Sequence, residues 1–431
     1  MCLSYFKEKL AASYPLTVIK NINQRVAIIG AGATGLAAAE VLQQKGYEHV
    51  KLFERNSHAG GKCRSIVIEE KIYELGAGVI TKNNTVPFSL AEKYQVPIKK
   101  AVYGENIFVD ENGQFQSKWT CREKLDIYWQ LFVRYRAILK KYQAIERPGF
   151  LNIDPDLTVP FSQFASKNKI TELADVFNLY LTGFGYCYSN HIPAAYVLKY
   201  LDWPTIRCFM KNQAYVFPDG IQNLWVRVAQ DHTVQYGADI KHIARNTDVI
   251  TIERESALEE FDSLILTTPL DEVENFIDLT DTERTFFNKI ETLDYKTILC
   301  TVKNLPKKSG FIPDNFCAER SGHPVFWYYR HADSNVYSFY MLAAMMLNQE
   351  VVIENLNKFV VKMGGEIEFV HQAVDWKYFP HVGTRDLREG FYEQLANMQG
   401  QKNTYYLGEL LNFSCIGATT DYAQKFIAKH F

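Results

Sequence analysis

Residues 25–54 read RVAIIGAGATGLAAAEVLQQKGYEHVKLFE, and this stretch decides the fold. The apolar run VAIIG predicts a buried strand, AGATG a turn, LAAAEVLQQKG a helix and VKLFE a second strand. Gly46 ends the helix, as glycine commonly does at a helix C-terminus. Because both strands are apolar, we expect them to be parallel neighbours buried under helices. The stretch is therefore a βαβ unit, and the fold class is α/β.

Three glycines in this unit have the spacing of a dinucleotide-binding turn of the Rossmann type. Gly30 permits the tight turn, Gly32 lets the backbone approach a pyrophosphate, and Gly35 allows close helix packing. Glu54 ends the next strand, near the position at which an acid accepts hydrogen bonds from ribose hydroxyls. A tight turn without a ligand is the alternative, and Glu54 argues against it. The candidate contacts here are Gly30, Ala31, Gly32, Ala33, Thr34, Gly35, Glu54 and Arg55.

The residues after Glu54 indicate that the dinucleotide is FAD rather than NAD. Gly60-Gly61, followed by Lys62 and Arg64, forms a second backbone stretch able to lie along a diphosphate or ribityl chain. Here the sequence resembles the flavin-containing amine oxidase and phytoene desaturase superfamily, whose signature is this glutamate, a five-residue gap and Gly-Gly-Arg. Lys62 stands in place of the usual arginine, so the charge is kept and the bidentate fork is lost. The resemblance implies cofactor contacts at Gly61, Lys62, Cys63, Gly76, Ala77, Gly78 and Val79.

A second element of this resemblance lies near the other end of the chain. Tyr405-Tyr406-Leu407-Gly408-Glu409 resembles the superfamily's strand ending in Gly-Glu, whose acid holds the ribityl hydroxyls. The resemblance implies that the helix beginning near Thr419 and Thr420 directs its N-terminus at the flavin, and that the backbone of Ile240 meets the adenine. Both ends of the chain are thus expected to form one site for FAD. We expect noncovalent FAD, because no cysteine or histidine lies in a recognisable flavin-linking motif.

Longer strings narrow the resemblance to the flavin-dependent polyenoic fatty acid isomerases. They are YLTGFGYCYSNHIPAAYVLKYLDW, GFIPDNFCAERSGH, DWKYFPHV and NMQGQKNTYYLGE. The implied reaction is a double-bond shift in a polyunsaturated fatty acid, in which the flavin N5 takes a hydride and returns it to another carbon. No protein residue is then expected as the catalytic group. An FAD-dependent amine oxidase and a flavin-binding protein without turnover are the alternatives.

The presumed substrate region is rich in aromatic residues, which are typical of apolar pockets and equally of cores. The pocket residues we expect are Phe184, Tyr186, Trp203, Trp327 and Phe379. The resemblance implies an arginine that anchors a fatty carboxylate just before residues 110–113, where this chain has Glu105 and Asn106. Either another cation has that role or the substrate lacks a free carboxylate. The candidate cations are Arg207, Lys211, Lys296 and Arg330.

Composition bounds the remaining possibilities. A chain of 431 residues exceeds one hydrophobic core, which predicts two domains. The net charge of -2 offers no field for nucleic acid, and the eight isolated cysteines and ten histidines show no metal-binding spacing. The apolar runs fall short of a membrane span or a secretory signal. We therefore expect a cytoplasmic protein with at most peripheral access to lipid, and the resemblance implies that its substrate is a fatty acid-like small molecule.

The predicted domain division follows the order of strand and helix signals. The FAD domain takes residues 25–80, 215–295 and 395–431, and includes strands in VQYGADIKHIA, VITIE and FDSLILTTP. A mixed α+β substrate domain takes residues 81–214 and 296–394, and its first part contains a long helix over about 122–145. Residues 1–24 form an N-terminal arm. The result is an amine oxidase-like two-domain fold.

Overall fold

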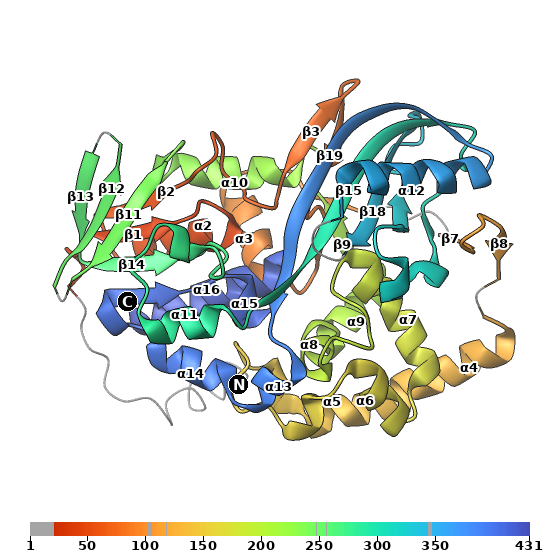
Figure 1. The fold of residues 1–431 in the computed structure, drawn as a ribbon, viewed down its shortest axis with the longest axis horizontal. Coiled ribbons are helices and arrows are strands. Elements are labelled where there is room, and N and C mark those ends of the chain that lie inside the picture. The colour runs from red at the N-terminus through yellow and green to blue at the C-terminus, as the bar shows by residue number, and fades with distance from the viewer. Residues whose placement is uncertain (1–20, 102–105, 118, 247, 256, 344–346) are drawn as a thin grey trace.

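The computed structural model describes residues 21–101, 106–117, 119–246, 248–255, 257–343 and 347–431 (Figure 1). Its first sheet has five parallel strands in the order β10-β2-β1-β14-β20, built around the stretch 25–54. All four residues of the central strand are buried, which explains its continuous apolar sequence. The strands are β1 (Val26–Ile29), β2 (Val50–Phe53), β10 (Thr233–Gln235), β14 (Ser263–Leu266) and β20 (Thr404–Tyr406).

Both faces of this sheet are covered. One face shares a core with the helices α2 (Ala33–Gln44), α3 (Thr85–Lys93), α10 (Ile221–Gln230) and α16 (Ile416–His430). Because α16 packs against α2 and α3, the last helix of the chain closes over the first βαβ unit. The other face packs against an antiparallel sheet of β11 (Ile240–Arg245), β12 (Ile250–Arg254) and β13 (Ala257–Phe261), and against α11 (Asp281–Phe287).

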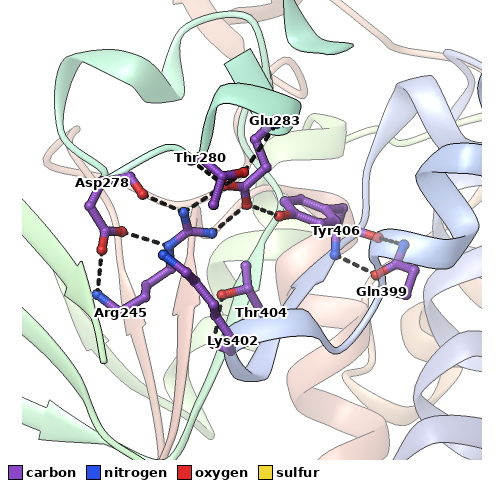
Figure 2. A network of polar contacts seen from close by, with 8 residues as sticks. All are labelled: Arg245, Asp278, Thr280, Glu283, Gln399, Lys402, Thr404 and Tyr406. Atoms are coloured by element: carbon purple, nitrogen blue, oxygen red, sulfur yellow. Dashed lines mark hydrogen bonds and ion pairs between the residues drawn. The ribbon is translucent and has the colours of Figure 1, made fainter. Parts of the chain in front are cut away.

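A buried polar network holds β20, the edge strand of the parallel sheet (Figure 2). The fully buried guanidinium of Arg245 binds both carboxylate oxygens of Glu283, at 2.5 and 2.8 Å. The same carboxylate accepts a hydrogen bond from the hydroxyl of Tyr406 on β20. The side chain of Gln399 accepts from the N–H of Tyr406 at 2.8 Å and donates to its carbonyl at 2.9 Å. The network therefore fixes the strand that leads into Gly408 and Glu409.

A second sheet, of seven strands, forms the upper right of Figure 1. Its order is β19-β15-β18-β17-β16-β7-β8, and α12 (Gln349–Lys362) packs on one face, where Trp327 meets Phe359. The strands are β7 (Ile107–Val109), β8 (Phe115–Gln116), β15 (Glu291–Lys303), β16 (Gly310–Phe311), β17 (Pro324–Tyr328), β18 (Val336–Ala343) and β19 (Glu366–His381).

A layer of helices lies below this sheet in Figure 1. The helix predicted over about 122–145 is present as α4 (Cys121–Trp129), a π-helical stretch (Gln130–Tyr135) and α5 (Arg136–Lys141). Thr120 and Glu123 start it with a capping box. The layer continues with α6 (Phe161–Lys167), α7 (Thr171–Leu181), the 3₁₀ turn Thr182–Phe184, α8 (Ala194–Tyr200) and α9 (Trp203–Met210).

Short elements join the two sheets. They are the hairpin of β3 (Ser65–Ile68) and β4 (Lys71–Glu74), a small sheet of β5 (Ile80–Thr81), β6 (Lys99–Lys100) and β9 (Ala214–Val216), and the helices α13 (Thr384–Arg388), α14 (Phe391–Met398) and α15 (Glu409–Asn412). None of the described helices combines the length and apolarity needed to cross a bilayer.

The strand positions bear on the domain division. All five strands of the parallel sheet fall within residues 25–80, 215–295 and 395–431, and we keep these segments as the proposed FAD domain. The boundary at 295, however, cuts β15, which runs unbroken from Glu291 to Lys303 in the seven-stranded sheet. A boundary near residue 290 leaves that strand whole, because its pairing with β18 and β19 belongs to the second sheet. The predicted arm lies mostly in 1–20, outside the described residues.

Candidate functional site

One continuous cavity of about 1640 Å³ runs between the two sheets. Single small-molecule pockets span roughly 300–1,000 Å³, so this cavity has room for two ligands. Backbone segments from both ends of the chain line one part, which we call the glycine-lined half and define by Gly30, Gly32, Gly60, Gly61 and Gly76. Side chains of the seven-stranded sheet line the other part, which we call the aromatic half.

The first glycine turn matches its predicted geometry. Gly30 has a φ of +104°, which side chains rarely adopt. A Cβ on Gly35 would lie 2.0 Å from the carbonyl oxygen of Gly30, so only glycine allows α2 to start this close to β1. No side chain caps α2 at Gly32, and Gly32, Ala33 and Thr34 line the cavity. The free N–H groups of this helix start are therefore available to an anion.

A second glycine loop lies directly against the first. The N–H of Gly60 donates to the carbonyl of Ala31 at 2.9 Å, and a Cβ on Gly61 would lie 3.2 Å from the Cα of Gly32. The following segment approaches just as closely, because a Cβ on Gly76 would lie 2.0 Å from the carbonyl oxygen of Lys62. Three backbone segments thus meet at one end of the cavity, where a bound group contacts peptide atoms rather than side chains.

Glu54 is oriented by its neighbours before any ligand binds. It is 5% exposed, and its carboxylate accepts hydrogen bonds from the N–H of Ala31 at 2.9 Å and from the N–H and side-chain amide of Asn56 at 2.9 and 2.8 Å. Glu54 and Ile240 both line the cavity. The carboxylate is therefore held where a ribose hydroxyl can reach it, beside the glycine turn.

Lys62 and Glu409 join the two ends of the chain. The ammonium of Lys62 lies 2.8 Å from the carboxylate of Glu409, and both side chains are about three-quarters buried. Gly408 has a φ of +124°, which turns the chain from β20 into α15. The salt bridge spans the junction between the glycine-lined half and the ring of Tyr378, whose centroid lies 5.4 Å from the same ammonium.

A second helix start faces the cavity at α16. No side chain caps this helix at Cys415, and Gly417, Ala418 and Thr419 line the cavity. The neighbouring hydroxyls of Thr268 and Ser414 are buried at the cavity wall without a hydrogen-bond partner. Two helix N-termini and unpaired polar atoms thus face one space, which fits a dinucleotide with polar groups along its length.

The aromatic half is built from one ring on each of six adjacent strands, a row we call the aromatic ladder. In spatial order its members are Tyr378 (β19), Tyr295 (β15), Tyr340 (β18), Phe326 (β17), Phe311 (β16) and Phe108 (β7), and all six line the cavity. Successive centroids lie 4.5–6.0 Å apart with interplanar angles of 14–30°. Five strand spacings of about 4.8 Å give the ladder a length of roughly 24 Å.

Two of the ladder hydroxyls are bonded to backbone carbonyls. The hydroxyl of Tyr295 donates to the carbonyl of Gly183 at 2.9 Å, and that of Tyr378 donates to the carbonyl of Ser414 at 3.3 Å. Across the cavity, Phe184 packs on Phe326 with centroids 6.0 Å apart. The surface that these rings offer to a ligand is therefore mostly aromatic carbon.

Most residues predicted for the cofactor line the cavity, and four lie behind it. Ala31, Gly35, Gly408 and Thr420 are absent from the lining. Ala31 orients Glu54 and Gly35 packs on Gly30, as described above, while Gly408 turns the chain and Thr420 donates to the carbonyl of Ile416 at 2.7 Å. The lining residues are Gly30, Gly32, Ala33, Thr34, Glu54, Arg55, Gly61, Lys62, Cys63, Gly76, Ala77, Gly78, Val79, Ile240, Glu409 and Thr419.

The structure corrects the expected pocket at three positions. Phe184 and Tyr186 line the cavity, but Trp203, Trp327 and Phe379 do not. Trp327 alternates with Phe326 along β17, so its ring enters the core under α12 instead. Phe379 follows Tyr378 and packs on His381, and Trp203 packs on Phe132 and Arg136 at the start of α9.

None of the five pocket residues expected from the sequence is a ladder ring, because the ladder is assembled from separate strands. Phe108, Phe311, Tyr295, Tyr340 and Tyr378 lie on strands far apart in sequence. The period-two pattern of FWYY at 326–329 was an available signal, since it places Phe326 and Tyr328 on one face and Trp327 on the other. Among the candidate cations, Arg330 lines the cavity, whereas Arg207, Lys211 and Lys296 do not. Glu105 lies outside the described residues, and Asn106 lines the cavity.

Comparisons with known proteins agree with this arrangement. The family model for "Flavin containing amine oxidoreductase" matches residues 33–344. The crystal structure of a CLA-producing fatty acid isomerase from P. acnes superposes with a TM-score of 0.91 at 30% identity, covering 96% of this chain and all of that one. The FAD-dependent oxidoreductase dpasF of Apiospora sacchari is 25% identical over 89% of this chain and 87% of its own length. Putrescine oxidase shares the fold, with a TM-score of 0.70 at 16% identity and 94% and 98% coverage.

These matches confirm two predictions. The fold is the two-domain α/β fold of the amine oxidase type, and the cofactor is FAD. The contacts of individual residues with FAD are taken up below as proposals. Among the described residues, no group of three or more His, Cys, Asp or Glu is arranged to hold a metal ion.

Proposed function

The chain belongs to the family of flavin containing amine oxidoreductases, which are FAD-dependent enzymes, and we propose that it isomerises polyunsaturated fatty acids by shifting a double bond. The observation that carries this proposal is the aromatic ladder, an apolar surface roughly 24 Å long that is continuous with the glycine-lined half. The likeness to the fatty acid isomerase of P. acnes supports it, because that likeness covers almost the whole chain.

We propose that FAD is held by backbone atoms of the glycine-lined half. The start of α2 and the loop at Gly60-Gly61 receive the diphosphate, Glu54 accepts from ribose hydroxyls, and Ile240 lies by the adenine. Glu409 accepts from the ribityl hydroxyls, and the start of α16 with Thr419 faces the ring. FAD bound here supplies a reversible hydride acceptor at N5.

Binding of FAD is proposed to be noncovalent. The two cysteines in the cavity wall are Cys63 and Cys415. Burial raises the pKa of both thiols, to about 11 for Cys415 and further for Cys63. Because the thiolate rather than the thiol is the nucleophile, neither residue is activated to form a flavin link.

The ladder contributes to this reaction in two ways. It holds the extended acyl chain against the aromatic rings, so that the hydride can return to the molecule from which it came. It excludes water from the positive charge left on the substrate when a hydride leaves the methylene between two double bonds. That charge is already delocalised over both double bonds.

The test compares reaction products under argon and in air. Holoenzyme without NAD(P)H is given linoleate, its methyl ester, or a set of amines, while diene absorbance, flavin absorbance and peroxide are followed. Isomerisation predicts conjugated diene under argon with no lasting flavin bleaching and no peroxide. Bleaching by amines with peroxide in air, and no diene from either lipid, would instead establish an amine oxidase.

A further inference from the structure

Charges in the cavity wall are unevenly distributed. Among the described residues that line it, nine are acidic and six are basic. The basic ones are Arg55, Lys62, Lys199, Arg330, Lys377 and Lys425. A free fatty acid is an anion at neutral pH, since carboxylic acids titrate near pH 4. Tight binding of a free fatty acid therefore requires that at least one of these six cations is available to its carboxylate.

Arg330 lines the cavity close to the ladder ring of Tyr340. Its charge acts on Tyr328 and Tyr340, and its side chain is 9% exposed. One guanidinium nitrogen lies 3.4 Å from the carboxylate of Glu74, and the other donates to the carbonyl of Phe217 at 3.1 Å. Glu74 is itself 5% exposed and fixed by the N–H of Ile221. The charge of Arg330 is therefore already balanced inside the protein.

The other cations in the cavity wall also have partners within the protein. Lys62, beside the ladder ring of Tyr378, pairs with Glu409 at 2.8 Å. Lys199 donates to the carbonyls of Ile145 and Gly149 at 3.0 Å each, and also to Arg147. The remaining pairings are Lys377 with Asp271 and Glu272, Lys425 with Asp421 at 2.7 Å, and Arg55 with Glu272 at 3.9 Å.

The ladder itself disfavours an anion. Its rings are stacked on one another, with interplanar angles of 14–25° between Tyr378, Tyr295, Tyr340 and Phe326, so they offer an anion ring carbon and no charge partner. A carboxylate seated there would lose its hydration and gain no free cation from the residues that the structure describes. An ester or another uncharged head group avoids both penalties.

From these pairings we infer that the substrate lying on the ladder is an uncharged polyunsaturated acyl derivative, such as an ester, and that Glu74 enforces this choice by neutralising Arg330. That the acyl chain is polyunsaturated rests on the proposed function. The preference for an uncharged chain concerns binding alone, and so it can be tested without turnover.

The binding test uses saturated chains that cannot react. Laurate and methyl laurate are titrated into holoenzyme at pH 8, with quenching of the fluorescence of Trp119 and Trp376, which line the cavity, as the readout. We expect methyl laurate to bind at least tenfold more tightly than laurate. Equal or tighter binding of laurate would overturn the inference.

Two variants assign the preference to Glu74. Glu74→Gln keeps the shape and frees the charge of Arg330, so it should improve laurate affinity at least fivefold and leave methyl laurate unchanged. Glu259→Gln removes a carboxylate that pairs with Lys51 and Arg254 outside the cavity, and it should alter neither ligand. An unchanged laurate affinity in a folded Glu74→Gln protein would refute the role of Glu74.

Arg330→Gln provides a second, independent test of the inference. If the account is right, this variant keeps its preference for methyl laurate, because Arg330 holds no substrate carboxylate. Loss of laurate binding alone would make Arg330 an anchor and contradict the inference. If methyl laurate is preferred while neither linoleate nor methyl linoleate is isomerised, the proposed reaction fails and the inference about substrate charge stands.

Discussion

The two halves of the cavity are built from different parts of the covalent structure. The glycine-lined half is walled by peptide atoms packed so closely that one added carbon at Gly35 or Gly76 would lie 2.0 Å from a carbonyl oxygen. The aromatic half is walled by side chains, one from each of six strands, at ordinary ring contacts of 4.5–6.0 Å. A wall of closely packed backbone cannot accommodate an added carbon atom, whereas a wall of side chains loses only part of its contacts when one ring is replaced. A single substitution should therefore reduce ligand affinity far more in the glycine-lined half than in the aromatic half.

The largest loss of FAD affinity is expected for substitution of Gly35. Gly35→Ala forces α2 away from β1, because its Cβ meets backbone rather than a movable side chain. FAD affinity should fall at least 100-fold, measured by equilibrium dialysis. Gly46→Ala is the matched control, since Gly46 also has a positive φ but has nothing within 4 Å of an added Cβ. Similar FAD affinities for the two variants would show that backbone packing does not define this half.

This contrast also explains what could be predicted from the sequence. The glycine turn and Glu54 lie within 30 residues, so their spacing alone indicates a nucleotide site. Lys62 and Glu409 are 347 positions apart, and the resemblance to a flavoprotein superfamily placed both at the cofactor but did not predict that they pair with each other. The ladder depends on the strand order β19-β15-β18-β17-β16-β7, which no local pattern contains. Trp327 was misplaced for a different reason, because the local alternation within β17, which puts it on the face opposite Phe326, was not applied. The cytoplasmic location stays a prediction.

The second expected effect concerns the strand that carries Gly408 and Glu409. Burial alone would raise the pKa of Glu283, but hydrogen bonds from Arg245, Tyr406 and Thr280 lower that pKa to about 2. Its folded pKa lies below its ordinary 4.5, so its contribution of roughly 3 kcal/mol is present above pH 4.5 and is lost as pH falls toward 2. Chemical denaturation between pH 5 and 2 should show this loss in the wild-type protein.

Glu283→Gln should remove most of that pH dependence and destabilise the protein at pH 7. Glu123→Gln is its control, because Glu123 occupies the same capping-box position on an exposed helix. A much smaller change is expected there. If both variants shift the unfolding midpoint equally, the buried network of Figure 2 does not stabilise β20 as described.

A third effect should be confined to the aromatic half. Tyr340→Leu removes a central ladder ring, and affinity for methyl laurate should fall about tenfold while FAD affinity stays unchanged, since an aromatic pair contributes about 0.5–1.5 kcal/mol beyond its area. Tyr329→Leu removes a ring that stacks on Tyr337 instead of lining the cavity, and should leave ligand affinity intact. Loss of FAD from Tyr340→Leu would show that the two halves are not separable.

The smallest effect is expected at Lys62. Its salt bridge with Glu409 is about one-quarter exposed, and such pairs contribute at most about 1 kcal/mol. Lys62→Ala should therefore weaken FAD binding by no more than about fivefold, measured by the same dialysis as for Gly35→Ala. A loss as large as that of Gly35→Ala would mean that charge, not backbone, secures the cofactor.

In the proposed reaction, a hydride leaves the substrate and returns to the same molecule while that molecule stays in the cavity. This return is tested most directly with methyl linoleate carrying two deuterium atoms on the methylene between its double bonds, mixed with unlabelled ester under argon. Mass spectrometry of the conjugated product should show both deuterium atoms retained in each labelled molecule, one at a new carbon, and no transfer to unlabelled molecules. Loss of one deuterium to solvent, or its appearance in unlabelled product, would contradict the account.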